Sequence, residues 1–176
     1  MLTLINDTIR LSQLDTSEQK VIYEAIDLYK IAEDCVNMLK FSAENHGITI
    51  SIHGTNAYLE GNKEMLEEVV YNLCDNAIRY NNEGGKVDVT VKPVKGKIYL
   101  CVEDNGIGIS KEHQERIFER FYRVDKSRSK STGGTGLGLA IVKHIIQQHG
   151  AHMELTSEKG KGTKIAVSYT HLTLPT

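Results

Sequence analysis

The stretch of residues 66–80 constrains the fold most, because its side chains divide into two faces at helical spacing. At about 100° per residue, four apolar side chains fall within one arc of a helix, namely Leu66, Val70, Leu73 and Ala77. A separate arc carries Asn72, Asn76 and Arg79. The pattern predicts a helix that packs on a core with one face and presents two amides and a guanidinium with the other.

The two amides are poor choices for an ordinary surface helix, but they can serve a ligand. Asparagine has low helix propensity and competes for backbone hydrogen bonds. The oxygens of Asn72 and Asn76, one turn apart, can instead ligate a hard cation such as Mg²⁺, which also keeps water and phosphate ligands. Taken alone, the same face also fits an ordinary solvated helix.

A second cluster follows an apolar strand, in the sequence Val102–Ile109. The carboxylate of Asp104 can accept a hydrogen bond from an exocyclic amine. Gly106 and Gly108 allow the backbone to approach a flat ring without an intervening Cβ atom. These features suit adenine, although a plain strand-to-helix turn has the same appearance.

A third cluster consists of glycines that lead into an apolar helix, in the sequence Gly134-Thr135-Gly136-Leu137-Gly138. Glycine costs about 1 kcal/mol relative to alanine inside a helix, so glycines here indicate a need for close backbone approach. The N–H groups and positive end of such a helix hold a phosphate chain. The spacing matches neither a P-loop nor a dinucleotide fingerprint. Helix packing alone is the alternative.

Composition narrows the class of protein. The chain has 176 residues, of which 40% are hydrophobic, which fits one domain with a packed core. The net charge of −2 provides no broad field for nucleic acid or an anionic bilayer. Cys35, Cys74 and Cys101 show no paired spacing, so we expect buried thiols. Apolar runs are short and no leader pattern follows Met1, which predicts a soluble, cytoplasmic domain.

Periodicity predicts alternating helices and strands. The expected helices are 1–14, 27–44 with Asp27 as its cap, 63–81 and 137–149. The expected strands are 20–26, 48–52, 57–60, 86–92, 97–103, 151–156 and 163–169. Lys95-Gly96 and the glycines of 159–162 are expected to form hairpin turns, and residues 119–135 a mobile loop.

Four motifs occur in a family-like order: Asn72–Ala77, Asp104–Gly108, Phe118–Phe121 and Gly134–Leu139. Over about residues 20–168 the chain resembles the catalytic and ATP-binding domain of bacterial sensor histidine kinases, in the superfamily that includes gyrase, Hsp90 and MutL. The resemblance implies an α/β fold, a two-layer sandwich of a mixed β-sheet covered on one face by helices (the Bergerat ATP-binding fold). ATP and Mg²⁺ would bind under a flexible lid.

The resemblance also implies roles for single residues. Asn76 would ligate Mg²⁺ with support from Asn72, and Asp104 would bind the adenine amine beside Gly106 and Gly108. Arg79 would point toward the phosphates, and Tyr80 would line the nucleotide. Backbone groups of five residues would hold the phosphates, namely Gly134, Thr135, Gly136, Leu137 and Gly138. Arg123 would approach the γ-phosphoryl group. ATP-hydrolysing relatives have a glutamate where Asn72 stands, so its absence favours transfer to a protein nucleophile.

The acceptor histidine of this family lies on a preceding helical hairpin and is usually followed by an acidic residue. None of the seven histidines here is followed by one, and the first is His46. Residues 1–15 are therefore expected to be the tail of that hairpin, 16–168 the catalytic domain, and 169–176 a tail that is partly non-native.

The implied partners are the hairpin, absent from this chain, and a response regulator, with a membrane reached only through more N-terminal regions. The isolated chain is expected to be a monomer. Two alternatives remain open: a serine kinase of the anti-sigma-factor type and a non-catalytic nucleotide-binding module.

Overall fold

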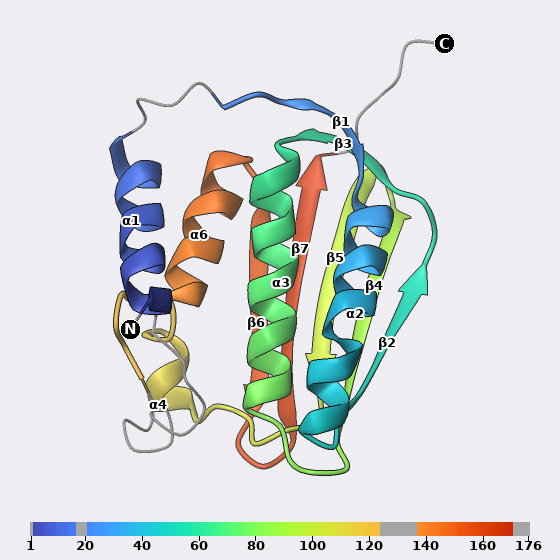
Figure 1. Cartoon of the computed structure of the whole chain (residues 1–176). Coiled ribbons are helices and arrows are strands. Elements are labelled where there is room, and N and C mark those ends of the chain that lie inside the picture. The colour runs from blue at the N-terminus through green and yellow to red at the C-terminus, as the bar shows by residue number, and fades with distance from the viewer. Residues whose placement is uncertain (1, 17–20, 124–136, 171–176) are drawn as a thin grey trace.

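Five strands form one mixed sheet, and three helices cover one of its faces (Figure 1). The computed structural model describes residues 2–16, 21–123 and 137–170. The helices over the sheet are α2 (Leu28–Asn45), α3 (Lys63–Arg79) and α6 (Gly138–Gln148), and α1 (Leu2–Thr16) lies against α6. This arrangement confirms the predicted two-layer α/β sandwich.

The sheet has the order β2-β4-β5-β7-β6. Its strands are β2 (Thr49–Gly54), β4 (Lys86–Val94), β5 (Lys97–Asp104), β7 (Gly162–Thr170) and β6 (His152–Glu158). Strands β2 and β4 run parallel, and every other neighbouring pair is antiparallel. A separate antiparallel ribbon pairs β1 (Glu24–Asp27) with β3 (Tyr58–Gly61).

Polar caps start the two long helices. The carboxylate of Asp27 accepts hydrogen bonds from the N–H of Tyr29 at 3.1 Å and of Ala57 at 2.9 Å. It therefore caps α2, as predicted, and also anchors the chain just before β3. Asn62, which the sequence reading did not single out, caps α3 by accepting from the N–H of Met65 at 2.9 Å.

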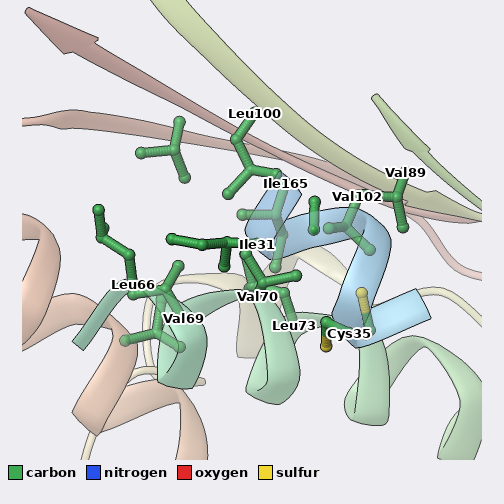
Figure 2. Close-up of a cluster of buried hydrophobic side chains, with 14 of the residues drawn as sticks. Ile31, Cys35, Leu66, Val69, Val70, Leu73, Val89, Leu100, Val102 and Ile165 are labelled. Carbon is green, nitrogen blue, oxygen red and sulfur yellow. The ribbon is translucent and has the colours of Figure 1, made fainter. Parts of the chain in front are cut away.

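The core lies between the helices and the sheet (Figure 2). Leu66, Val70 and Leu73 of α3 are at most 2% exposed and face the sheet, where Leu100 of β5 is fully buried. The predicted apolar arc of α3 is therefore its core face. The three cysteines are buried free thiols, as expected.

Some boundaries differ from those expected. A short helix, α4 (Lys111–Gln114), was not predicted, and α3 ends at Arg79 rather than at 81. Strand β7 continues to Thr170, past the expected domain end at 168, because Tyr169 pairs with Ile98 and is only 2% exposed. Of the predicted mobile loop, 119–135, residues 124–135 lie outside the described residues. Within the described helices, none is long and apolar enough to span a bilayer.

A half-buried histidine, His149, joins the end of α6 to the start of α3. Nε2 of His149 accepts a hydrogen bond from the N–H of Asn62 at 3.1 Å, so this nitrogen carries no proton. Nδ1 donates to the carbonyl of Ile145 at 2.9 Å. Burial lowers the pKa of His149, against a smaller opposing effect of the Ile145 carbonyl. The fold thus holds His149 in its neutral form.

We predict that the free energy of unfolding falls as the pH drops below about 6.5, because the unfolded chain then binds a proton that folded His149 resists. One such proton contributes a slope of at most about 1.4 kcal/mol per pH unit. In His149→Gln, whose amide oxygen can still accept, this part of the slope disappears. Urea unfolding between pH 7 and pH 5 measures it, with exposed His152→Gln as the control. Equal slopes in the wild type and His149→Gln would contradict the prediction.

Candidate functional site

The polar face of α3 lies where the sequence placed it. Asn72 and Asn76 are half-buried, one turn apart, on the flank opposite the core residues of the same helix. Nε of Arg79 donates to Oδ2 of Asp75 at 2.8 Å, and both side chains are only 20–25% exposed. Arg79 therefore lies along α3 in an i, i+4 ion pair, a partner that the sequence reading missed.

The start of α6 approaches the first of these amides. A Cβ atom placed on Gly138 would lie 3.3 Å from Oδ1 of Asn72, so a side chain there would require the Asn72 amide to shift by a few tenths of an ångström. The preceding Leu137 is fully buried and forms the N-cap, and its side chain has no atom that accepts a hydrogen bond. The start of α6 thus faces the Asn72 side of α3.

Asp104 is the last residue of β5 and begins the turn that follows, the Asp104 turn, with its two carboxylate oxygens in different settings. Oδ1 accepts from the N–H of Gly106 at 2.9 Å and from that of Thr163 at 3.3 Å. Within the described residues, no donor reaches Oδ2. Burial is the main cause that raises the pKa of Asp104, and the two backbone donors oppose it. The turn therefore holds a fixed, half-buried carboxylate with one open acceptor.

The same turn contacts the end of α3. The N–H of Ile107 donates to the carbonyl of Tyr80 at 3.1 Å. A Cβ atom on Gly106 would lie 2.5 Å from that carbonyl oxygen, too close for any side chain. The contact places Tyr80, the C-cap of α3, next to the Asp104 turn.

The β6–β7 hairpin packs on the other side of the turn, backbone against backbone. Gly108 has φ +68°, and a Cβ atom there would lie 2.0 Å from the carbonyl oxygen of Glu158. The N–H of Gly160 donates to the carbonyl of Ile107 at 2.7 Å. Gly162 would bring a Cβ atom to 2.0 Å from the carbonyl oxygen of Asp104. The close approaches at Gly108 and Gly162 therefore need glycine, whereas the space around Gly160 is open.

Several residues that hold this region together were not predicted from the sequence. Asn81 is only 8% exposed, and its side chain donates to the carbonyl of Lys86 at 3.1 Å and accepts from the N–H of Asn82 at 2.8 Å. Thr163, Ser157 and Gln114 hydrogen-bond around the Asp104 turn. Only the glycines of 160–162, beside Thr163, gave a local signal. The hydrogen bonds of Ser157 to Ile109 and to Gln114 are made over long sequence separations, whereas those of Asn81 are local.

The structure thus brings α3, the Asp104 turn and the start of α6 into one region. Asn72 lies against Gly138, and Tyr80 against Gly106. Gly134, Thr135 and Gly136 lie outside the described residues. Arg123 is the last described residue before that gap.

A metal ion in this region would depend on amide oxygens. Among the residues that the structure describes, no group of three or more His, Cys, Asp or Glu side chains is placed to hold a metal. Mg²⁺ needs few protein ligands when phosphate oxygens and water complete its shell. The half-buried oxygens of Asn72 and Asn76 fit that chemistry, and Gly138 leaves space beside the first of them.

Residues 61–174 match the model of a family described as histidine kinase-, DNA gyrase B-, and HSP90-like ATPase. The chain belongs to this family. Sensor-like histidine kinase SenX3 of Mycolicibacterium smegmatis is 40% identical over 166 residues, which is 94% of this chain and 43% of the relative. Sensor histidine kinase WalK of Bacillus subtilis is 36% identical over 168 residues, 94% of this chain and 28% of the relative. The chain thus spans less than half the length of these curated relatives.

Solved structures show the same fold. The mycobacterial sensor histidine kinase MprB superposes with a TM-score of 0.74 at 26% identity, covering 85% of this chain and 98% of that one. Full-length ShkA, a complex with AMPPNP, gives a TM-score of 0.84 at 23% identity over 99% of this chain and 37% of that one. Within the family, this chain is therefore the ATP-binding catalytic domain of a sensor histidine kinase, and not the alternative serine kinase.

We predict that Gly108→Ala destabilises the fold more than Gly96→Ala. Both glycines have positive φ, +68° and +78°, so both variants have a left-handed alanine that costs about 1–2 kcal/mol. Only at Gly108 does the new Cβ atom also meet a carbonyl oxygen, whereas the space around Gly96 is open. Denaturant unfolding of both variants measures the difference. Equal losses would mean that the hairpin moves away from the Asp104 turn without cost.

Proposed function

We propose that this chain binds Mg-ATP between α3, the Asp104 turn and the start of α6. It then provides the γ-phosphoryl group to a histidine on a helical hairpin outside this chain. The observation that carries the proposal is the asymmetry of the Asp104 carboxylate, in which two backbone donors hold Oδ1 while no described residue donates to Oδ2.

Because this carboxylate is held in a fixed direction, Oδ2 can accept only from a hydrogen-bond donor at a matching position. The exocyclic amine of adenine supplies an N–H group at an edge of a flat ring, and Oδ2 can accept it. Gly106 and Gly108 keep side chains away from the turn, so a ring can lie close to the backbone. Adenine would therefore dock at the end of β5, beside Tyr80.

The triphosphate would extend from there along α3. The oxygens of Asn76 and Asn72 would hold Mg²⁺, which would offset part of the negative charge of the phosphates. Backbone groups at the start of α6, from Gly134, Thr135 and Gly136 through Leu137 and Gly138, would hold the phosphates. Arg79 would have to leave Asp75, or share it, to reach them.

Phosphoryl transfer depends mainly on positioning and on stabilising negative charge. Arg123 would contribute positive charge near the γ-phosphoryl group as the bond to the leaving oxygen breaks. An amide stands at Asn72, where hydrolysing relatives have a glutamate, and an amide cannot take a proton from water at neutral pH. Transfer to a protein nucleophile is the reaction that this residue favours.

Helix α1 would be the end of the hairpin that carries the acceptor histidine. Leu11 and Leu14 of α1 are buried in the core, and Nε of Arg10 lies 2.7 Å from Oε1 of Glu68 on α3. These contacts would join the hairpin to the catalytic domain. In the full kinase, the hairpin would dimerise, a response regulator would receive the phosphoryl group, and more N-terminal regions would provide a membrane anchor.

We predict that Asp104→Asn weakens ATP binding about 10- to 100-fold without lowering the stability of the unliganded protein. The amide keeps an oxygen for Gly106 and Thr163, but its NH₂ group opposes the adenine amine. Because burial raises the pKa of Asp104, the carboxyl favours folding below its unfolded pKa, and this stability is lost as pH rises through the folded pKa. At pH 7 the ionised group therefore disfavours the folded state. Calorimetric titration and urea unfolding measure the two effects.

Asp34→Asn, on the exposed face of α2, is the control for loss of one negative charge. Unchanged ATP affinity in Asp104→Asn would remove Asp104 from the binding site. A large loss of stability would instead show that its charge supports the fold.

We predict that this chain, labelled ATP and a separately produced hairpin domain together form phosphohistidine. Asn76→Ala should lose both the Mg²⁺-dependent part of nucleotide binding, measured by calorimetry, and the transfer. Asn37→Ala on the exposed side of α2 should retain both. A hairpin whose acceptor histidine is replaced by alanine should remain unlabelled.

Each other outcome has a different meaning. Phosphoserine on a partner, or ATP binding without any transfer, would contradict the proposed transfer to a histidine. If Asn76→Ala binds ATP with unchanged affinity in Mg²⁺, the metal assignment is wrong.

A further inference from the structure

Beyond its last glycine, the loop that carries Asp104 is held at both backbone groups of Ile109. The N–H of Ile109 donates to Oγ of Ser157 on β6 at 2.8 Å. The carbonyl of Ile109 accepts from Nε2 of Gln114 on α4 at 2.8 Å. Nε2 of Gln114 also donates to the carbonyl of Ser157 at 2.9 Å. The side chain of Ser157, far away in the sequence, and that of nearby Gln114 therefore satisfy both backbone groups of Ile109 and join the loop to the sheet.

The hydroxyl of Ser157 has one proton, and its neighbours determine where that proton points. Oγ of Ser157 lies 3.0 Å from the carbonyl of Gly162, which can only accept, and 2.8 Å from Oγ1 of Thr163. If Ser157 donates to Gly162, it accepts from both Ile109 and Thr163, and every partner is satisfied. Ser157 thereby also fixes Thr163, whose backbone N–H donates to Oδ1 of Asp104.

The loop needs such support. Between Asp104 and Ile109 it contains Gly106 and Gly108, and glycine has the largest backbone freedom to lose on ordering. Its two ends are held differently: Asp104 by the ladder of β5 with β7, and Ile109 by side chains alone. The direction of the open Asp104 oxygen depends on both ends.

We propose that Gln114 and Ser157 are positioning residues for recognition of the purine 6-amino group. They act through Ile109 and Thr163 on the orientation of the Asp104 carboxylate. This role rests on the proposed ATP site. In this role Gln114 depends on α4, because this short helix brings it to the junction of the loop and β6.

The test compares ATP with the triphosphate of purine riboside, which lacks the 6-amino group. Calorimetry measures the Kd of both nucleotides for the wild-type 176-residue chain, Gln114→Met and Ser157→Ala. Methionine has nearly the length of glutamine but no donor. We expect the wild type to prefer ATP, and each variant to lose about tenfold in ATP affinity while its affinity for the analogue stays the same. Exposed Gln148→Met, on α6, should match the wild type.

A merely structural role would weaken both nucleotides equally, so parallel losses overturn the proposal, as does unchanged ATP affinity. Circular dichroism checks folding, and if Gln114→Met does not fold, the Ser157→Ala ratio decides. A wild type that binds ATP and the analogue equally would overturn the adenine assignment of the proposed function itself. A preserved preference in both variants would overturn only the positioning role.

Discussion

The burial of one face of α3 fixes both the core and the site. Leu66, Val69 and Val70 are fully buried between α2, α6 and the sheet, and Leu73 is only 2% exposed. A rotation of α3 by one residue, about 100°, would expose these side chains and bury an amide without a partner, and both changes are unfavourable. Hydrophobic packing therefore sets the direction of Asn72, and the polar face needs no polar contact to hold its orientation.

A second constraint acts at the Asp104 turn, where the backbone packs directly against the backbone of neighbouring segments. The carbonyl oxygens of Asp104, Glu158 and Tyr80 each lie where a Cβ atom of a facing glycine would be. Such approaches leave no space for side chains to interlock. Hydrogen bonds therefore set the position of the hairpin relative to the Asp104 turn, as between Gly160 and Ile107. Hydrogen bonds of this kind give modest net stability, but unmade ones are costly, which makes the arrangement specific.

The sequence predicted those features that local physics determines. Helical period gave both faces of α3, a polar residue before an apolar run gave the Asp27 cap, and Lys95-Gly96 gave the β4–β5 turn. Features that depend on long-range contacts were not predicted. The clamp of Gln114 on Ser157 spans 43 residues, and neither residue type is unusual in its own segment. Arg79 shows the same limit within one helix, because its pairing with Asp75 competes with the role that the motif implied.

In the proposed site, the Asp104 carboxylate would connect the stability of the fold to nucleotide binding. Burial raises its pKa, so the ionised form is disfavoured in the unliganded fold, and the two backbone donors at Oδ1 compensate only in part. A donor at Oδ2 would reduce this cost, and only the nucleotide-bound state would provide one. Bound nucleotide would then stabilise the folded protein by mass action as well as by local contact. A residue that destabilises the unliganded protein and stabilises the nucleotide-bound protein is typical of groups selected for binding rather than for stability.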